Sequence, residues 1–172
     1  MYVSVLQEPR PLERRDDRSR FQSGNAEIDD WFHRFAWQNH RAGNARVFVT
    51  TQEPETLGFY ALSMGAVQRS TLPDDLKPGQ RPEPCPVLLL ARLAVDQRAQ
   101  GRGIGAALLK DALLRAYRLS NEVGFAALLV HCANDQAREF YLSQSSQFVS
   151  CPGANNHLML PLRALQEFVN TL

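Results

Sequence analysis

The chain has 172 residues, is 44% hydrophobic and 22% charged, and has a formal net charge of +1. This length predicts a single domain spanning residues 1–172, and the balanced charge neither requires nor excludes a nucleic-acid partner. The three cysteines have no regular spacing, which argues against a disulfide framework. No segment resembles a signal peptide or a membrane span, so we expect a cytoplasmic protein with no membrane partner.

The N-terminal part predicts a strand over residues 2–6, an exposed charged connection over residues 9–20, and then an amphipathic helix. Ser23 to Asn25 supply the helix start, and the helix is expected to run to about Ala42. Its apolar residues repeat at helical spacing: Ile28, Trp31, Phe32, Phe35 and Ala36. Arg41 and Arg46 belong to a local excess of basic groups beside aromatic residues, which either holds a phosphate backbone or is a solvated helix face.

Residues 46–51 and 57–67 are predicted as two strands of a hairpin with a loop of about five residues. A glycine at position 65 predicts a bulge or a close backbone approach there. The proline-rich residues 71–86 predict a long loop, followed by a buried strand over residues 87–95. Arg92 interrupts this apolar strand and must be either paired internally or turned toward a binding cleft.

A glycine-rich turn over residues 100–105 follows that strand, and a helix begins directly behind it. Successive backbone N–H groups can converge in such a turn, and the helix N-terminus adds partial positive charge, so the turn predicts an anion cradle. Arg98 and Arg102 are expected to add mobile positive charge. The helix has an apolar stripe at positions 109, 112, 113 and 116, and its polar positions 111, 115 and 118 are expected on the opposite face.

Three phosphate-binding patterns can be compared with this turn. The ATP-loop pattern GxxxxGK[ST] is absent. The dinucleotide pattern is met by Gly101, Gly103 and Ala106, but the next predicted strand, residues 125–130, ends in His131 instead of an acidic residue. The third pattern, [QR]-x-x-G-x-[GA], is matched by Gln100, Gly103 and Gly105, and again in overlap from position 98.

The third pattern resembles the GCN5-related N-acetyltransferase (GNAT) family, in which this loop grips the pyrophosphate of acetyl-coenzyme A. The strand end ARLAVD at residues 91–96 and the segment from Asn134 to Tyr141 strengthen the resemblance. We therefore expect an α+β fold: a single GNAT-like domain whose mixed, mostly antiparallel sheet is flanked by helices on both faces. The resemblance also implies acetyl-CoA as co-substrate.

Segments at residues 21–31, 39–46, 58–63 and 90–96 resemble one branch of this family, the toxins of type II toxin–antitoxin pairs. That branch acetylates the α-amine of aminoacyl-tRNA and arrests translation. The resemblance implies two partners, aminoacyl-tRNA and a ribbon-helix-helix antitoxin, and a homodimer is expected. Two alternatives remain open: an acetyltransferase for a small amine or a protein N-terminus, and a non-catalytic CoA-bound co-regulator that acts with an antitoxin.

The resemblance implies roles for individual residues. Tyr141 would be the general acid that protonates the leaving thiolate, and Asn134 would lie beside the cofactor. The thioester and pantetheine would face Leu93, Ala94 and Val95. The pyrophosphate would face Gln100, Gly101, Arg102, Gly103, Ile104, Gly105 and Ala106. On the substrate side, the candidates are Arg41, Arg46 and Arg92. Tyr141 could instead be a core residue, and Asn134 could be a helix cap.

The C-terminal part departs from the family pattern, because no Gly-Phe pair follows the helix of Tyr141. Beyond this point, residues 147–150 and 157–160 predict closing strands and residues 162–169 a terminal helix. His131 and Cys132 are adjacent, but no second Cys or His pair stands at ligand spacing, so no metal site is expected. An α-amine has a pKa of about 8 and an adjacent ester lowers it, so the proposed acceptor needs no strong base.

Overall fold

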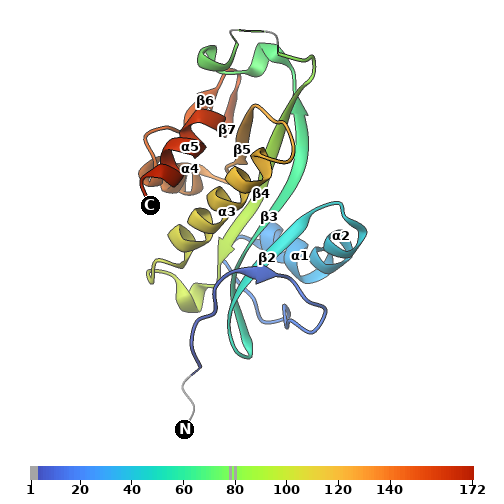
Figure 1. Cartoon of the computed structure of the whole chain (residues 1–172). Helices are drawn as coiled ribbons and strands as arrows, with labels where there is room; N and C mark the ends of the chain where they lie inside the picture. The colour runs from blue at the N-terminus through green and yellow to red at the C-terminus, as the bar shows by residue number, and fades with distance from the viewer. Residues whose placement is uncertain (1–3, 78, 80) are drawn as a thin grey trace. The chain divides into compact units, whose positions relative to one another are not determined.

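The computed structural model describes residues 4–77, 79 and 81–172, and it is an α+β fold (Figure 1). Its α-helices are α1 (Ala26–Arg34), α2 (Ala36–Ala42), α3 (Ile104–Ser120), α4 (Asp135–Gln144) and α5 (Leu162–Asn170). Its strands are β1 (Arg10–Pro11), β2 (Arg46–Gln52), β3 (Glu55–Val67), β4 (Cys85–Val95), β5 (Ala127–His131), β6 (Val149–Cys151) and β7 (Ala154–Pro161). Short 3-10 turns are η1 (Arg69–Thr71), η2 (Asp74–Leu76) and η3 (Gln97–Ala99).

The strands form a seven-stranded sheet in the order β1-β2-β3-β4-β5-β7-β6. The pairs β1–β2, β2–β3, β5–β7 and β6–β7 are antiparallel. The pair β4–β5 is parallel, with Leu88 opposite Leu128 and Leu90 opposite Val130. The predicted mixed, mostly antiparallel sheet is therefore confirmed. None of the helices in the described part of the chain is long and apolar enough to span a membrane.

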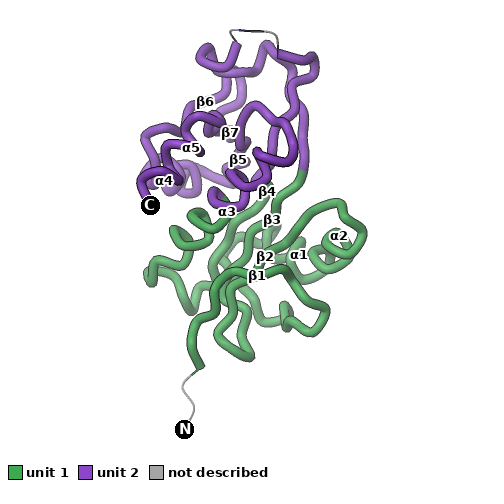
Figure 2. Tube along the Cα trace, in the orientation of Figure 1, with its two compact units in different colours: residues 1–63, 91–112 green, residues 64–90, 113–172 purple. Residues whose placement is uncertain are grey.

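The chain divides into two compact units (Figure 2). Unit 1 consists of residues 1–63 and 91–112, and unit 2 consists of residues 64–90 and 113–172. Strands β3 and β4 and helix α3 each supply residues to both units. The units are therefore interleaved in sequence, and neither corresponds to one continuous stretch of chain.

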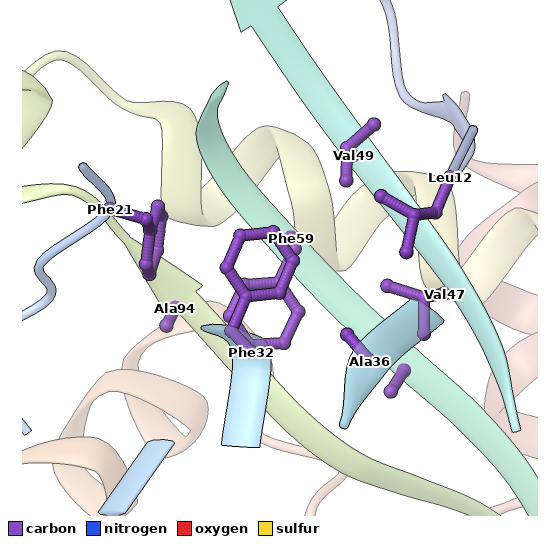
Figure 3. Packing of buried hydrophobic residues seen from close by; sticks show 9 residues of the cluster. Leu12, Phe21, Phe32, Ala36, Val47, Val49, Phe59 and Ala94 are labelled. Carbon is purple, nitrogen blue, oxygen red and sulfur yellow. The ribbon is translucent and has the colours of Figure 1, made fainter. Parts of the chain in front are cut away.

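The core of unit 1 is built on aromatic rings that α1 and β3 supply (Figure 3). The rings of Phe32 and Phe59 are stacked with centroids 4.0 Å apart, and Phe21 meets Phe32 edge to face at 4.8 Å. A glycine at position 58 allows α3 to approach β3 closely, because a Cβ there would lie 2.8 Å from Cδ1 of Leu108. Unit 1 thus holds its helices by aromatic packing and close backbone approach.

The core of unit 2 is mainly aliphatic. Four successive residues of β5, from Ala127 to Val130, are buried, as is expected for a strand covered on both faces. Val87 from β4, Met159 from β7 and Leu72 from the proline-rich loop pack in the same buried cluster. The long loop between β3 and β4 is therefore tied to the core at Leu72, although it contains no strand in its described part.

The N-terminal prediction was wrong in two respects. Residues 2 and 3 of the predicted strand lie outside the described residues, and residues 4–6 form no strand. The strand β1 lies instead in the stretch expected to be an exposed connection. There Arg10 donates to both carboxylate oxygens of Asp16 at 2.7 and 2.8 Å, and the side chain of Leu12 is buried in the core. This ion pair and this apolar contact hold a highly charged segment against β2.

The predicted helix to Ala42 is interrupted at Phe35, whose φ of −120° and ψ of −18° separate α1 from α2. Its start is confirmed, since the side chain of Asn25 accepts from the N–H groups of Glu27 and Ile28. Phe35 was predicted on the core face but is 38% exposed. The break turns the following residue, Ala36, into the core, where it is fully buried.

The hairpin is tighter than predicted, because β2 continues to Gln52 and β3 begins at Glu55. Polar residues continue the strand ladder here, so the predicted loop of five residues is reduced to two. The β2–β3 pair has a register shift between Thr50 and Thr51. A Cβ at Gly65 would make only ordinary contacts, so the close backbone approach predicted there is not found. The remaining predicted elements are present, with their ends moved by a few residues.

On α3, the predicted apolar stripe is buried. Asp111 was expected on the face opposite this stripe, but it is partly buried and faces β3. Tyr60 of β3 donates a hydrogen bond to Oδ2 of Asp111 at 2.5 Å. A carboxylate beside the stripe is thus stabilised by a buried phenol, which hydrophobic periodicity alone does not reveal.

Candidate active site

The turn between β4 and α3 has an open backbone. Gly101 and Gly103 have φ values of +81° and +80°, in the left-handed region that favours glycine. A Cβ at either position would meet no atom within 4 Å, so the glycines are required by backbone conformation and leave open space beside the turn. Helix α3 begins immediately afterwards, at Ile104.

The same turn presents free hydrogen-bond donors. The N–H of Ala107 donates to the carbonyl of Gly103 at 3.1 Å. Among the described residues, no acceptor is found for the backbone N–H groups of residues 101–106. Free N–H groups at a helix N-terminus, where partial positive charge accumulates, suit a phosphate oxygen. The predicted anion cradle therefore has the geometry that its chemistry needs.

Side chains at the turn bond to the backbone of the segment before α1, and these bonds fix the position of the turn. The carboxylate of Asp96 is buried and accepts from the backbone N–H groups of Gln22 at 3.0 Å and Arg98 at 2.8 Å. Nε2 of Gln100 donates to the carbonyls of Ser23 at 3.0 Å and Val95 at 3.1 Å. Gln100, the first residue of the matched pattern, therefore braces the turn through its side chain.

The ionisation of Asp96 follows from its partners. Burial alone would raise the pKa of this carboxyl, but hydrogen bonds from the Arg98 side chain and from the backbone of Gln22 and Arg98 outweigh burial and lower the pKa. Asp96 is therefore charged at neutral pH and acts as the fixed anchor of the turn.

The expectation that Arg98 supplies mobile positive charge was wrong. Its guanidinium pairs with Asp96 at 2.8 Å and with Glu55 at 3.0 Å, and its hydrogen bond to Asp96 is the main cause of its raised pKa. Arg102 is different: it is exposed, and its one hydrogen bond within the described residues is to the neutral Oε1 of Gln52, at 3.3 Å. Of these two arginines, Arg102 retains a charge that a bound anion can use.

Strand β4 leads into this turn with alternating side chains. Ala94 is buried in the core of unit 1, whereas Leu93 and Val95 are partly exposed. Arg92 lies on the same side of the strand as Ala94, by the two-residue period of a β-strand. Its guanidinium carbon lies 4.2 Å from the centre of the Trp31 ring.

Arg92 has no internal ion pair in the described part of the chain, so that alternative is not what the structure contains. The side chain is partly buried; burial lowers its pKa, and the charge of Glu27 acts in the opposite direction. Arg41 is exposed, and Arg46 donates to the carbonyl of His40 at 2.7 Å, at the end of α2. These three arginines belong to unit 1.

Unit 2 carries the remaining predicted residues. The side chain of Asn134 accepts from the N–H of Ala137 at 2.8 Å, so its role as the cap of α4 is confirmed. Tyr141 is 3% exposed and packs between Phe140 and Phe148, with ring centroids at 5.2 and 5.9 Å. Within the described residues its hydroxyl makes no hydrogen bond, and the hydroxyl oxygen is not among the fully buried polar atoms that lack a partner.

The surroundings of Tyr141 keep its phenol protonated. Burial, and secondly the neighbouring thiol of Cys132, raise the pKa of Tyr141. A phenol with a raised pKa is a neutral proton donor over the physiological pH range. The packing that would make Tyr141 a core residue is therefore the same packing that preserves its proton.

His131 and His157 face each other on β5 and β7, with Nδ1 and Nε2 3.1 Å apart. Residues 4–77, 79 and 81–172 contain no group of three or more His, Cys, Asp or Glu side chains placed to hold a metal ion. All three cysteines are buried and free.

The pattern described as the Acetyltransferase (GNAT) domain matches residues 43–144, a stretch that contains both the turn and Tyr141. The chain belongs to the GNAT acetyltransferases. Enzymes of this family transfer an acetyl group from acetyl-CoA, and the open turn described above fits the anionic part of that molecule.

Three comparisons sharpen the family assignment. The chain is 40% identical to the tRNA-acetylating toxin of Mycobacterium tuberculosis (strain ATCC 25618 / H37Rv) over 167 residues, covering 97% of this chain and 99% of that protein. The structure of AtaT complexed with acetyl-methionyl-tRNAfMet matches with a TM-score of 0.85 at 26% identity, covering 96% and 99% of the two chains. A tyrosine-to-phenylalanine mutant of AtaT, bound to the C-terminus of the antitoxin AtaR and acetyl-CoA, matches with a TM-score of 0.79 at 25% identity, covering 96% and 99%.

This GNAT acetyltransferase is thus a homologue of a tRNA-acetylating toxin. The sequence did not indicate a role in the candidate site for two residues, Asp96 and Trp31. Asp96 belonged to a matched motif but had no assigned role; the signal was an acidic residue directly between a buried strand and a glycine turn. Trp31 was assigned only to the core, and nothing in the helical period indicated that its ring would contact the guanidinium of Arg92.

Proposed function

We propose that the chain is the toxin of a type II toxin–antitoxin pair, and that it blocks translation by acetylating the α-amine of aminoacyl-tRNA. The observation that carries the proposal is the 40% identity to a tRNA-acetylating toxin over 97% of this chain. The open turn and the protonated Tyr141 supply the two groups that such a transfer needs, an anion site and an acid.

In this proposal, the backbone N–H groups from Gly101 to Ala106 bind the pyrophosphate of acetyl-CoA, and Arg102 adds charge. Leu93, Ala94 and Val95 line the path of the pantetheine and the thioester. Gln100 braces the turn, and Asn134 lies beside the cofactor as it caps α4. Acetyl-CoA supplies an activated acetyl group when it is bound.

Tyr141 acts as the general acid. The amine nitrogen forms a bond to the acetyl carbon, the carbon–sulfur bond breaks, and the phenol proton of Tyr141 passes to the sulfur. The α-amine reacts in its neutral form and then releases a proton to solvent, from which the Tyr141 phenolate regains its own proton. Since such an amine has a pKa of about 8 or below, the chain need not supply a strong base.

The acceptor RNA is placed on unit 1. Arg41 and Arg46 are exposed and Arg92 is partly exposed, and each offers a guanidinium that no carboxylate of the described residues pairs with. Guanidinium groups bind phosphate through parallel hydrogen bonds, which suits an RNA backbone.

The proposal extends to partners and organisation. The whole chain, residues 1–172, acts as one GNAT domain in the cytoplasm, where its aminoacyl-tRNA substrate is found. A separately encoded ribbon-helix-helix antitoxin neutralises it, and the toxin acts as a homodimer. The complex of the neighbour AtaT with the C-terminus of AtaR supports an antitoxin partner.

The experiment incubates purified protein and labelled acetyl-CoA with total aminoacylated tRNA, deacylated tRNA or a panel of free amines. We expect label only on charged tRNA, and loss of that label in Tyr141→Phe. Sequencing the labelled tRNA then identifies the amino acid.

Two outcomes would contradict the proposal. Label on free amines but not on charged tRNA would indicate a small-amine acetyltransferase. No label on any acceptor, with CoA binding intact, would indicate a non-catalytic co-regulator.

A further inference from the structure

We propose that α1 of unit 1 carries a binding track for the unpaired 3′ strand of the acceptor RNA, in which Arg92 holds a phosphodiester and Phe35 holds a base. This inference rests on the proposed function. It specifies which part of the RNA is recognised and which side chains recognise it.

Arg92 ends a stack of aromatic rings that begins in the core. Phe32 and Phe59 are parallel within 6°, with centroids 4.0 Å apart, and Trp31 is stacked on Phe59 at 6.1 Å with an interplanar angle of 17°. The guanidinium carbon of Arg92 lies 4.2 Å from the centre of the Trp31 ring. The guanidinium is therefore held in position before any ligand binds, which lowers the entropic cost of binding.

No carboxylate of the described residues pairs with the guanidinium of Arg92. No hydrogen bond or ion pair to Arg92 is found among the described residues, and Glu27 acts on it only through its charge at a distance. A partly buried arginine without a paired carboxylate has lost hydration and gained only a ring contact. Its in-plane N–H groups match a phosphate, which binds such a fork through two parallel hydrogen bonds.

The position of Arg92 selects which phosphate it holds. Arg92 lies on β4, next to the segment from Leu93 to Val95 that we place at the thioester. At roughly 3.3 Å per residue, the backbone of Arg92 is within about 10 Å of Val95. The phosphate must therefore be close to the aminoacyl ester, at the 3′ end of the RNA, and not in a distant arm.

A second pair of an arginine and an aromatic ring lies one helical turn farther along. The N–H of Phe35 donates to the carbonyl of Trp31 at 2.9 Å, and Phe35 is 38% exposed. The guanidinium carbon of Arg34 lies 5.0 Å from the centre of this ring. Arg34 also pairs with Asp30 at 3.3 Å, so its main contribution to a ligand is a stacking surface, not net charge.

Exposed rings with adjacent guanidinium planes favour single-stranded RNA over a duplex. Unpaired bases can turn outward and stack on such surfaces, whereas the bases of a helix are already stacked on one another. The break between α1 and α2 at Phe35, which turns Ala36 into the core, also explains why this phenylalanine is exposed. The helix break is thus the feature that makes the second position of the track.

The test compares kcat/KM for three acceptors that carry the same aminoacyl ester: intact tRNA, a trinucleotide with the tRNA 3′-terminal sequence, and an ethyl ester without RNA. The variants are Arg92→Gln, Arg92→Lys and Phe35→Ala, with Arg14→Gln as control. Arg14 is an exposed arginine outside the track, so its substitution removes the same charge.

For Arg92→Gln, we expect the ratio of kcat/KM for tRNA to that for the ethyl ester to fall about 10- to 100-fold, through KM. The trinucleotide should show the same loss. The slope of log kcat/KM against log salt concentration should decrease by about 0.7, the value for one contact to single-stranded phosphate. Arg92→Lys should restore the slope, and Phe35→Ala should lower the ratio about tenfold without changing the slope. Arg14→Gln should leave the ratio unchanged.

Three results would overturn the inference: an unchanged ratio in Arg92→Gln, a loss with tRNA that is absent with the trinucleotide, or an equal loss in Arg14→Gln. If Arg92→Gln does not fold, as judged by thermal unfolding, Arg92→Lys and Phe35→Ala carry the test. Failure of the unsubstituted protein to acetylate any charged tRNA would instead refute the proposed function itself.

Discussion

The two units differ in how they prepare their polar groups: unit 1 positions backbone hydrogen-bond donors, whereas unit 2 buries a phenol. In unit 1, the Asp96 carboxylate and Nε2 of Gln100 bond to neighbouring backbone groups, and the backbone N–H groups of residues 101–106 have no acceptor among the described residues. In unit 2, Tyr141 is packed among apolar and aromatic groups, and burial raises its pKa. Unit 1 fixes hydrogen-bond donors in place, and unit 2 keeps the Tyr141 phenol protonated by packing it among apolar groups.

This difference assigns separate energetic tasks to the units. A cradle of fixed N–H groups stabilises a ligand in the ground state, so damage to it should weaken binding. A proton donor acts only as the leaving group departs, so damage to it should slow the reaction without weakening binding. The predictions below test this separation, from the largest expected effect to the smallest.

Tyr141→Phe should lower the turnover number for acetyl transfer about 10²- to 10⁴-fold, the range for loss of a general acid. Phenylalanine keeps the ring that packs against Phe140 and Phe148, so folding and CoA affinity should change little. Turnover assays and CoA titration of the same preparation measure both quantities. A turnover number within threefold of the unsubstituted protein would remove Tyr141 from the mechanism.

Asp96→Asn should destabilise unit 1 by about 1.5–3 kcal/mol, the range for hydrogen bonds to a charged group. The pKa of Asp96 is lowered in the folded protein, so its stabilisation is present above the unfolded pKa of about 3.9 and is lost as pH falls through the folded pKa. Urea unfolding followed from pH 7 to about pH 2 should therefore show an effect of the substitution that shrinks only below about pH 4. The control is Asp74→Asn, at an exposed position; an equal effect of the two substitutions would contradict the anchor role.

Gly103→Ala should raise the half-saturating concentration of acetyl-CoA about tenfold and leave the maximal rate nearly unchanged. A side chain at φ +80° costs about 1–2 kcal/mol, which the turn can relieve only by moving its N–H groups. Gly124→Ala is the matched control, because its φ is not in the left-handed region and no atom lies within 4 Å of the added Cβ. Similar binding by the two variants would show that the cradle tolerates rearrangement.

The pair of His131 and His157 should make unit 2 mildly sensitive to acid. Burial, and secondly the charge of His131, lower the pKa of His157. A histidine in the unfolded chain has a pKa of about 6.5, so near this pH the unfolded chain binds more protons than the folded protein. The free energy of unfolding therefore decreases as pH falls below that value. We expect the free energy of unfolding to decrease by ~0.5 kcal/mol between pH 7.5 and pH 5.5, since these rings are screened by solvent. His131→Asn should reduce the loss in thermal unfolding; an unchanged pH dependence would exclude the pair as its source.

The features that depend on residues close together in the chain could be predicted from the sequence. The cap at Asn134 and the glycine turn depend on residues that are neighbours in the chain, and both were located correctly. The buried strand before the turn was recognised by its run of apolar residues, and the fold class followed from the family resemblance. These features are specified within a few residues of where they act.

The errors have a common physical origin in contacts between distant parts of the chain. The charge of Arg98 is neutralised partly by Glu55, and Asp111 is held by Tyr60; neither partner can be identified from spacing. The exposure of Phe35 depends on a helix break, and helical periodicity cannot report that break because Phe35 itself fits the apolar stripe. Predicting such features requires the pairing of the sheet and the packing of α3, which local pattern does not contain.

The most direct test of the division between the units is the single-turnover rate of acetyl transfer to aminoacylated tRNA, measured against acetyl-CoA concentration for Tyr141→Phe and Gly103→Ala side by side. We predict a crossed result: Tyr141→Phe lowers the maximal rate at least 100-fold with its half-saturating concentration unchanged. Gly103→Ala raises the half-saturating concentration about tenfold with its maximal rate nearly unchanged. If both variants changed the same parameter, the separation of binding in unit 1 from proton donation in unit 2 would be wrong.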